Sequence, residues 1–419
     1  MPSHNVPNLF TCKLIRDIFS DIYTKDWLLL QTEILITKKI NYIYMQKMCF
    51  LMLTYRCNLN CIYCYQKYKT AQDMTLETAK SVVEKEVQLA RELNNKEGVR
   101  FDLFGGEPLL KFDLIKELCT WIWDTIQDVK VDIFITTNGT LLDDEKKEWL
   151  KTHKEKINLV MSVDGKDDVQ ECNRGCHSSD LPVKWVLDTM PNCFLSMTVP
   201  RKSLLKFADE LIYFHEQGYH IEAKPAQGED WQEGDGKQYE SQLNKIADYY
   251  ISHPNVNPIY LFKEVSYLHL LNNEPNEKYG KTCGAADELV AYDVKGHLFP
   301  CHHFLPNVNG KTDILDYLNT VDFSDSARFA DDECMKCEIL KLCRTCCARN
   351  YNERGDVSRR DKRTCQIMLA EAKAISSYQI RKYMQNKYDL NPQELLMLKA
   401  AIKCHQLCCD FEKKFYATK

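Results

Sequence analysis

The chain has 419 residues, of which 44% are hydrophobic and 27% are charged, and its formal net charge is −5. This composition predicts a globular protein of two or three domains, and the weak negative charge gives no electrostatic case for nucleic acid. No run approaches the roughly 18 uninterrupted apolar residues of a membrane span, so a membrane partner is not expected either. The chain contains 20 cysteines and lacks a signal-peptide pattern, which favours metal ligation in a reducing cytoplasm over a disulfide framework.

Short β-rich runs alternate with amphipathic stretches between residues 45 and 225. Helices are predicted near residues 75–94, 111–126, 143–152, 182–190 and 203–217, with Thr75 and Asp143 as N-caps. This alternation indicates parallel strands joined by right-handed crossovers, so the predicted fold class is α/β, with a partial (β/α)6 barrel. The predicted strands are Met48–Leu53, Arg100–Phe104, Val131–Thr136, Ile157–Val163, Cys193–Val199 and His220–Lys224.

The pattern changes after the barrel. Residues 226–282 are predicted to form a bridging region, with a loop followed by helices near 238–252 and 258–272. Cysteine density rises over residues 283–365 while apolar periodicity falls, which predicts a small domain organised by metals rather than by a core. Residues 366–419 predict two helices. Three cysteines of the second helix, Cys404, Cys408 and Cys409, are interpreted as a half-buried face.

The first 44 residues are the least regular part of the chain. They contain an apolar, aromatic run from Trp27 to Tyr44 with little clear period, and Met45 stands just before the first predicted strand. Two interpretations stay open. Either translation starts at Met45 rather than Met1, or these residues add a hairpin or helix to the edge of the barrel.

Three cysteines, Cys57, Cys61 and Cys64, form a C-x3-C-x2-C triplet directly after the first predicted strand. The triplet therefore lies in the loop at the C-terminal end of that strand, where sheets of this class carry their chemistry. Three thiolates are one fewer than the four that fully ligate a 4Fe-4S cube, so one iron would be free. An open metal position indicates catalysis, as it does at zinc sites.

The triplet, with aromatic Tyr63 before its last cysteine, resembles that of the radical S-adenosylmethionine (SAM) enzymes. In that family the open iron binds the amino and carboxylate groups of the methionine moiety. The run Gly105-Gly106-Glu107-Pro108 follows the second strand and is similar to the family segment that holds the methionine amino group.

The same resemblance extends to later strand ends. It implies that Ser162 lies near the ribose and that Arg174 binds the methionine carboxylate, which suits a guanidinium fork. Asn138 and Asp164 each stand beside a glycine, so they are equally well explained as cofactor contacts and as ordinary turn residues.

A second set of cysteines resembles the SPASM domain of radical enzymes that modify peptides and proteins. The resemblance implies two auxiliary 4Fe-4S clusters, although C-x2-C pairs also build zinc ribbons. Some family members have a further ligand at the position of Leu289, so one auxiliary iron is expected to be open unless Cys346 fills it. One cluster would use Cys334, Cys337, Cys343 and Cys365, and the other would use Cys283, Cys301 and Cys347.

Anaerobic sulfatase maturases carry a catalytic aspartate directly after the cysteine equivalent to Cys301. Here the next residues are His302 and His303, which could still accept a proton and are the candidate catalytic residues. The replacement of this aspartate by histidine favours an oxidoreductase activity other than sulfatase maturation. The chain is expected to be an anaerobic maturase that uses a 5′-deoxyadenosyl radical to form thioether or carbon–carbon crosslinks in a peptide or protein, or to epimerise a residue.

Two alternatives stay open: an anaerobic sulfatase-maturating enzyme, and a non-catalytic iron–sulfur sensor or electron carrier. The expected partners are a peptide or protein substrate and an electron donor such as flavodoxin or ferredoxin. Forty-four residues before the barrel are too few for a typical winged-helix module that grips a leader peptide. Leader binding is therefore expected from a separate protein, from the C-terminal tail or from an edge strand.

Overall fold

The computed structural model describes residues 46–417, except 273–274, 282, 312, 345 and 386–389. The predicted N-terminal extension, residues 1–44, and the choice between Met1 and Met45 lie outside this part of the chain. No helix among the described residues is long and apolar enough to cross a membrane.

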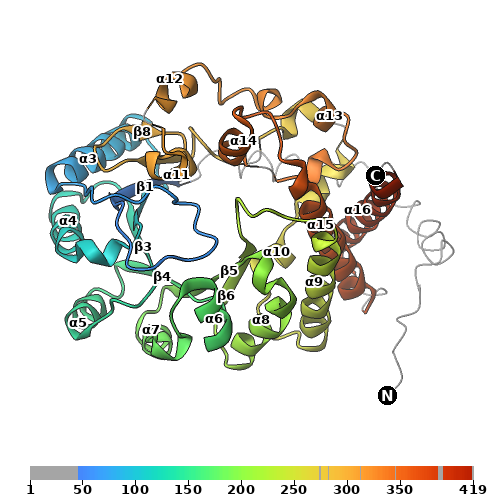
Figure 1. Ribbon diagram of the computed structural model, residues 1–419, viewed down its shortest axis with the longest axis horizontal. Helices are drawn as coiled ribbons and strands as arrows, with labels where there is room; N and C mark the ends of the chain where they lie inside the picture. Colours follow the sequence, from blue (N-terminus) through green and yellow to red (C-terminus); the bar gives the residue numbers. More distant parts are fainter. Residues whose placement is uncertain are drawn as a thin grey trace.

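A curved sheet of eight strands runs through the molecule, in the order β6-β5-β4-β3-β2-β1-β7-β8 (Figure 1). Neighbouring strands from β1 to β6 pair in parallel, as expected of a partial barrel. Each predicted strand is present, with ends within one residue of those expected. The six strands are β1 (Lys47–Thr54), β2 (Val99–Gly105), β3 (Val131–Thr137), β4 (Ile157–Ser162), β5 (Cys193–Val199) and β6 (Ile221–Pro225).

Helices cover the outside of this sheet. The Thr75 hydroxyl accepts the N–H of Thr78 at 3.1 Å, and the Asp143 carboxylate accepts that of Lys146 at 3.0 Å, so both predicted N-caps are confirmed. The predicted helices correspond to α3 (Leu76–Glu92), α4 (Phe112–Thr125), α5 (Asp144–Thr152), α7 (Val183–Thr189) and α8 (Phe207–Glu216).

One further helix, α6 (Asp167–Arg174), was not predicted. Its buried residues are Val169 and three polar side chains, so the helix shows no apolar period that a sequence pattern could reveal. It ends at Gly175, which adopts a left-handed conformation with φ 78°. Arg174, a candidate cofactor ligand, is therefore presented by the last residue of a short polar helix.

The two faces of the barrel sheet differ in burial. On the outer face, Leu51, Phe101 and Ile133 are 0% exposed beneath the helices. On the inner face, Phe50 and Phe104 of neighbouring strands are only half-buried. Because successive side chains of a strand alternate between faces, the barrel has a close-packed outside and a more open interior. The C-terminal ends of the parallel strands border this interior.

The bridging region is less helical than expected. Helix α9 (Asp235–Ser252) is present, but the second predicted helix, residues 258–272, is replaced by the single turn of α10 (Tyr260–Lys263) and a 3-10 turn at Ser266–Leu271. Pro258 precedes this segment, and the 3-10 turn follows an extended residue, Glu264. The apolar residues here lie on two separate short turns rather than along one helix face.

The cysteine-rich segment continues the barrel sheet, which the sequence did not predict. Strand β7 (Leu289–Tyr292) pairs in parallel with β1, and β8 (Leu298–Phe299) pairs antiparallel with β7. The segment also has apolar side chains in its interior, because Phe299, Phe304 and Phe329 are at most 2% exposed. The expectation of a domain without a core was therefore wrong. Its helices, α11 (Pro306–Asn309), α12 (Ile314–Leu318), α13 (Asp332–Met335) and α14 (Cys347–Arg354), are too short for a visible period.

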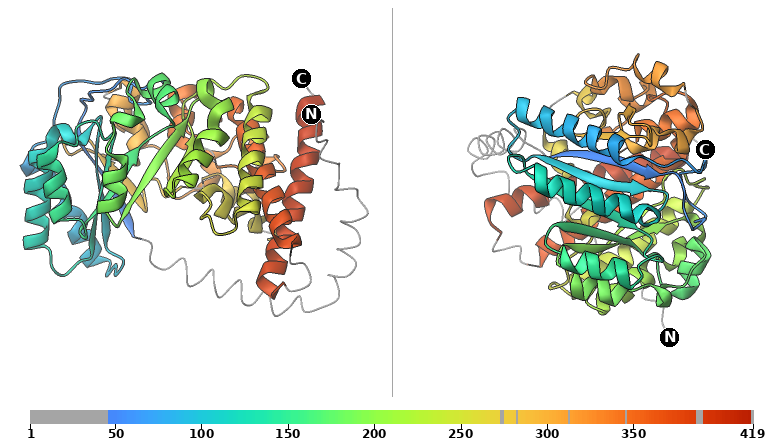
Figure 2. Two further views of the ribbon diagram at one scale, coloured as in Figure 1. Left: turned by 90° about the horizontal axis from the view of Figure 1, so that it is seen from below. Right: turned by 90° about the vertical axis from the view of Figure 1, so that its left-hand side faces the viewer.

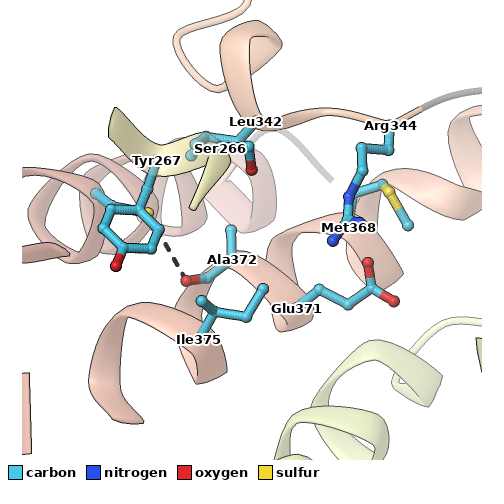
Figure 3. A pocket seen from close by; sticks show the side chains of 9 residues that line it. Ser266, Tyr267, Leu342, Arg344, Met368, Glu371, Ala372 and Ile375 are labelled. Atoms are coloured by element: carbon cyan, nitrogen blue, oxygen red, sulfur yellow. Dashed lines mark hydrogen bonds between the residues drawn. The ribbon is translucent and has the colours of Figure 1, made fainter. Parts of the chain in front are cut away.

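The tail forms two helices as predicted, α15 (Cys365–Met384) and α16 (Pro392–Ala417). At the end of the molecule away from α5, α15 packs against α9 and α16 packs against α15 (Figures 1 and 2). Cys404 and Cys408 are 1% and 0% exposed, in keeping with their interpretation as packing residues. The Cys404 Sγ lies 3.7 Å from the Ala372 carbonyl oxygen beside a cavity of about 20 Å³ (Figure 3). This space is enough for about one water molecule.

Candidate functional site

The triplet cysteines lie in the loop after β1 and are all half-buried. Burial raises the pKa of Cys57, and burial raises the pKa of Cys61 to about 11, with the other thiols of the triplet adding to the shift. Arg174 acts in the opposite direction on Cys61. The three thiols therefore lie within electrostatic reach of one another, and protons would be released when metal binds them.

The Gly105–Pro108 segment packs directly against the cysteine loop. The Gly106 N–H donates to the Thr54 carbonyl and the Glu107 N–H donates to the Arg56 carbonyl, each at 2.9 Å. A Cβ on Gly106 would lie 2.2 Å from the Arg56 carbonyl oxygen, so this close approach requires glycine. Pro108 begins a 3-10 turn directly afterwards. The segment is thus held against the backbone that leads into the triplet.

The Glu107 carboxylate is engaged within the protein. It is 1% exposed and accepts from the Thr137 hydroxyl at 2.6 Å, the Asn138 N–H at 2.8 Å and the Leu109 N–H at 3.1 Å. Burial raises the pKa of Glu107, and these donors oppose that shift. The carboxylate ties the ends of β2 and β3 together, which leaves backbone carbonyl groups of the segment as acceptors for a ligand amino group.

The Asn138 side chain supports the cysteine loop. Its amide nitrogen donates to the Asn58 side-chain oxygen at 3.0 Å, and its own oxygen accepts from the Thr140 N–H at 3.0 Å. Asn58 lies between Cys57 and Cys61 of the triplet. The structure therefore gives Asn138 a role in fixing the loop, beyond the turn that the sequence suggested.

Asp164 is the centre of a buried polar network. Its side chain is 0% exposed and accepts from the Tyr63 hydroxyl at 2.7 Å, from Arg174 Nη2 at 2.9 Å and from the Thr198 N–H at 2.9 Å. Burial raises the pKa of Tyr63. Asp164 thus connects the cysteine loop, helix α6 and strand β5, and positions both of the candidate cofactor residues that it touches.

Arg174 has a buried donor without a partner. Its Nε is buried and has no hydrogen-bond partner among the described residues, although Nη2 is bound to Asp164. Burial lowers the pKa of Arg174, but the charges of Asp164 and Tyr63 outweigh it and the net shift is upward. A permanently charged, incompletely bonded guanidinium near Cys61 fits the carboxylate of a methionine moiety.

Ser162 ends β4, where it pairs with Ser196 of β5. Both side chains are half-buried. Because neighbouring Met161 and Val163 are fully buried on the outer face, Ser162 lies on the inner face at the C-terminal edge. This position is compatible with the predicted ribose contact, which stays a prediction.

The first auxiliary group gathers the four cysteines that were expected to share a cluster. Burial raises the pKa of Cys365 to about 12, and Cys343, Cys334 and Cys337 contribute in that order. No sequence motif marks Arg360, whose Nη1 donates to the Cys343 Sγ at 3.2 Å. Arg360 is only 4% exposed, although it stands in a short run rich in basic residues. A buried guanidinium here offsets the negative charge of thiolate ligands.

The second auxiliary group contains Cys346 beside the three expected cysteines. A hydrogen bond from the Cys347 thiol lowers the pKa of Cys283 to about 6, so these two sulfurs are in contact. After burial, the charge of Cys346 contributes most to raising the pKa of Cys301. Cys346 therefore lies with Cys283, Cys301 and Cys347. Leu289, at the position of the further family ligand, instead begins β7.

No three His, Cys, Asp or Glu side chains of the described residues converge in the way that a single metal ion requires. The cysteines nevertheless fall into groups of the size and chemistry that iron–sulfur clusters use. Three thiols with an unpartnered arginine donor form one group, and four thiols form each of the others. The residues present therefore fit one cluster with an open iron and two auxiliary clusters.

The candidate catalytic histidines line the barrel interior. The His302 ring lies 4.4 Å from the Phe50 ring and 5.7 Å from the Phe104 ring, and the His303 ring lies 4.4 Å from that of Tyr65. Burial lowers the pKa of both, to about 3 for His303 and well below 6.5 for His302. Both imidazoles are therefore neutral at pH 7, and a proton accepted by either would be held weakly.

Comparison with known proteins agrees with this geometry. The Radical SAM superfamily model matches residues 51–190. The chain is 24% identical over 346 residues to the radical SAM cyclopropyl synthase TigE of Paramaledivibacter caminithermalis, covering 76% of this chain and 71% of that protein. It is also 24% identical to a cysteine-type anaerobic sulfatase-maturating enzyme of Clostridium novyi, covering 70% and 85%. Some other curated relatives are matched over only 28–37% of their length.

Two solved structures share the fold. The structure of anSMEcpe with bound AdoMet has a TM-score of 0.62 at 18% identity, covering 84% of this chain and 98% of that chain. Streptococcus suis SuiB bound to the precursor peptide SuiA has a TM-score of 0.53 at 19% identity, covering 84% and 86%. The fold of this protein is thus a cysteine-rich α/β partial barrel. Residues 51–190 match the Radical SAM superfamily, and the chain resembles the SPASM-type maturases; the cofactors that this match implies are SAM and a 4Fe-4S cluster.

Proposed function

We propose that this radical SAM protein is a maturase that removes a hydrogen atom from a peptide or protein substrate and so installs an oxidative modification or an epimerised residue. The observation that carries the proposal is that the cysteine triplet and an auxiliary cysteine group border the same open interior of the barrel. The triplet lies at the strand ends, and His302, next to Cys301 of an auxiliary group, packs on the inner-face ring of Phe50. Relatives of similar length include a cyclopropyl synthase and a sulfatase-maturating enzyme.

When bound, a 4Fe-4S cluster and SAM supply the one-electron chemistry that removes a substrate hydrogen atom. Cys57, Cys61 and Cys64 would hold this cluster. Backbone carbonyls of the Gly105–Pro108 segment would accept from the methionine amino group, and the free Nε of Arg174 would donate to the carboxylate. Ser162 would contact the ribose.

Other residues would position this site. Asp164 fixes the direction of Arg174 and the ring of Tyr63, through the bonds described above. The buried outer face of the sheet provides a rigid support, and the half-buried inner face excludes much of the solvent. A site that limits water protects a reactive radical from side reactions.

We further propose the auxiliary ligands. Cys334, Cys337, Cys343 and Cys365 would hold one auxiliary cluster beside Arg360. Cys283, Cys301 and Cys347 would hold the other, with Cys346 as its fourth ligand in place of the expected open iron. A fully ligated cluster has no iron for a substrate thiolate. This arrangement therefore favours a carbon–carbon crosslink or another electron-removing oxidation over thioether formation through an iron-bound thiolate.

The proposed partners follow from this activity. They are a peptide or protein substrate, a low-potential electron donor such as flavodoxin or ferredoxin, and a separate leader-peptide-binding protein. The SuiB structure with its precursor peptide shows that a protein of this fold accommodates such a ligand. That observation supports a peptide substrate for the present chain.

Anaerobic coexpression with each small open reading frame beside the gene, followed by mass spectrometry, tests the function. A crosslink removes two hydrogen atoms from the peptide. Epimerisation leaves the mass unchanged but introduces one deuterium from heavy water. The Cys57, Cys61 and Cys64 triple alanine variant is the control and should leave each peptide unmodified. Peptides that stay unmodified while wild-type protein forms 5′-deoxyadenosine would count against a maturase of neighbouring peptides.

Sulfatase maturation is the second candidate. It is supported by similarity over 85% of the length of the Clostridium novyi enzyme. The presence of His302 and His303, with lowered pKa values, where sulfatase maturases have aspartate weakens it. Coexpression with a cysteine-type sulfatase discriminates the two, because formylglycine in that sulfatase would support this candidate and an unchanged cysteine would oppose it.

A further inference from the structure

A cavity of about 180 Å³ lies where the end of β6 meets the cysteine-rich segment. By the same measure one water needs only about 10–15 Å³, so the space suits a side chain of a ligand. Its lining includes Lys224, Trp231, Arg344, Cys346, Arg349 and Glu371. The cavity thus joins the edge of the barrel interior to the auxiliary group that contains Cys346.

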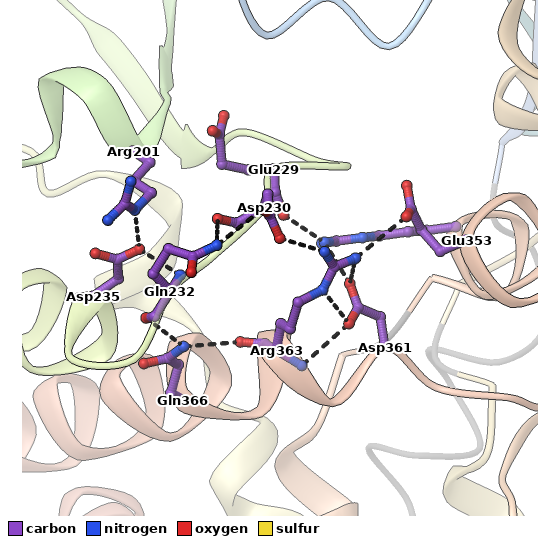
Figure 4. Close-up of polar contacts among 10 residues, drawn as sticks. Arg201, Glu229, Asp230, Gln232, Asp235, Glu353, Asp361, Arg363 and Gln366 are labelled. Atoms are coloured by element: carbon purple, nitrogen blue, oxygen red, sulfur yellow. Dashed lines mark hydrogen bonds and ion pairs between the residues drawn. The ribbon is translucent and has the colours of Figure 1, made fainter.

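One wall of the cavity is held by ion pairs between distant parts of the chain. Arg363 contacts both Asp230 and Asp361, so it ties the loop after β6 to the residues before α15 (Figure 4). Gln366 at the start of α15 also donates to the Gln232 carbonyl at 2.9 Å. The cavity is therefore bordered by a fixed contact between the barrel and the cysteine-rich segment.

Most charged groups that line the cavity already have partners. Arg344 pairs with Glu264 at 2.9 Å, and Arg349 pairs with Asp361 at 3.0 Å. The carboxylate of Glu371 accepts from the Tyr239 hydroxyl at 3.2 Å. The ion pairs offset the charges of Arg344 and Arg349, and burial raises the pKa of Glu371, which favours its neutral form.

Lys224 is different. Among the described residues no carboxylate lies within ion-pair distance of its ammonium group, and Arg174 is the one charge that affects its pKa. Burial lowers the pKa of Lys224, and Arg174 lowers it further. The side chain is nevertheless open to solvent, as expected in a cavity rather than in a packed core.

The strand register explains where Lys224 points. It pairs with Thr198 of β5, and the neighbouring Met197 is fully buried on the outer face. Lys224 therefore belongs to the inner face. Its charge also acts on His302 and His303, so the ammonium group lies within electrostatic reach of both imidazoles.

We propose that Lys224 anchors a carboxylate of the peptide substrate, carried by an aspartate or glutamate side chain, in this cavity beside Cys346. An accessible ammonium group without a paired carboxylate, on the wall of a cavity large enough for a side chain, offers a carboxylate a charge-assisted hydrogen bond. SAM also carries a carboxylate, but the free Nε of Arg174 near Cys61 provides a separate site for it. The inference rests on the proposed function because it names the acidic group by which the substrate is held.

Competitive acetylation of lysines in the full chain tests the proposal without turnover. N-acetylglutamate α-amide, which keeps its side-chain carboxylate, is the probe, and N-acetylglutamine amide is its neutral match. The glutamate probe should slow acetylation of Lys224 by about threefold or more near saturation, by mass action, while the glutamine probe has no effect. Exposed Lys154 serves as the internal control and should react at the same rate throughout.

A second arm separates the two sources of carboxylate. Slower acetylation of Lys224 with SAM, but not with the glutamate probe, would assign the lysine to the cofactor and overturn the proposal. Equal rates with and without every probe would overturn it too. Because no catalysis is needed, either result leaves the maturase activity to be judged by its own mass-spectrometric test.

Substitutions of Lys224 measure how much its charge contributes to binding of the glutamate probe. The dissociation constant of the glutamate probe, followed by NMR, should rise about tenfold in Lys224→Gln because the charge-assisted hydrogen bond is lost, which corresponds to about 1.4 kcal/mol. Lys224→Arg keeps the charge and should stay within about threefold of wild type, and Lys154→Gln should match wild type. Equal affinity of the probe for wild type and for a folded Lys224→Gln variant would contradict the proposal.

Discussion

The cysteine loop after β1 and the cysteine-rich segment differ in what holds their thiols in place. The loop is fixed by protein groups alone, through the bonds of Gly106 to Thr54 and of Tyr63 to Asp164. Apart from Cys365 at the start of α15, the auxiliary thiols lie on loops and on helices of four to eight residues, and Cys283 and Cys347 contact each other directly. The comparison indicates that the first site is preformed by the fold, whereas the auxiliary sites depend on metal for part of their stability.

The largest effect is expected from changing Cys57, Cys61 and Cys64 together to alanine. SAM cleavage should be abolished, and iron after anaerobic reconstitution should fall by about four from a total of about twelve per chain, from the ligand sets proposed here. The thermal unfolding midpoint should change little because protein groups hold the loop. Chromatographic detection of 5′-deoxyadenosine and an iron assay measure both, and continued 5′-deoxyadenosine formation by the variant would show that the triplet is wrongly assigned.

Cys343→Ala should lower the stability of the protein as well as its iron content, unlike the triple variant. It removes an auxiliary ligand and leaves Arg360 without its sulfur acceptor, so about four irons should be lost and the folded state destabilised by several kcal/mol. Cys119→Ala is the matched control because Cys119 is equally buried but lies in α4. It should keep all iron and lose only about 1 kcal/mol. Equal iron contents in the two variants would argue against the auxiliary assignment.

Asp164→Asn tests whether the loop is truly preformed. Removing one partner of a buried ion pair destabilises a protein by about 3–5 kcal/mol, and here the carboxylate charge is lost and one of the two oxygens that accept from Tyr63 and Arg174 becomes an amide nitrogen. The urea midpoint should fall and SAM binding should weaken. Asp168→Asn removes an exposed ion pair with Lys206 and should change stability by less than about 1 kcal/mol. Similar urea midpoints for the two variants would indicate that the Asp164 network does not stabilise the fold.

Gly106→Ala should have the smallest effect on function, and that effect should be specific to the SAM site. The added Cβ would overlap the Arg56 carbonyl oxygen, so the segment must move away from the cysteine loop. We expect SAM affinity to fall by about tenfold, which corresponds to about 1.4 kcal/mol. Gly218→Ala, at a left-handed position with nothing within 4 Å of the added Cβ, is the control. It should lose about 1 kcal/mol of stability and bind SAM normally. Unchanged SAM affinity in Gly106→Ala would mean that the segment tolerates displacement.

Much of this protein was determined by local sequence patterns. The six barrel strands, five of their helices and both N-caps follow from periodicity and capping residues, because these depend on interactions within a few positions. The triplet and the auxiliary cysteines were found for a related reason, since metal ligands must recur at spacings that one short loop can present. Such features need no knowledge of the rest of the chain.

The tertiary structure decided the rest. Asp164 receives Tyr63 from 101 positions earlier, and β7 joins β1 although more than 200 residues separate them in the chain. Helix α6 lacks an apolar period, and Arg360 and Lys224 are ordinary charged residues in the sequence. Contacts of this kind are selected by the burial and pairing of groups from distant segments, so they exist only once the chain has folded.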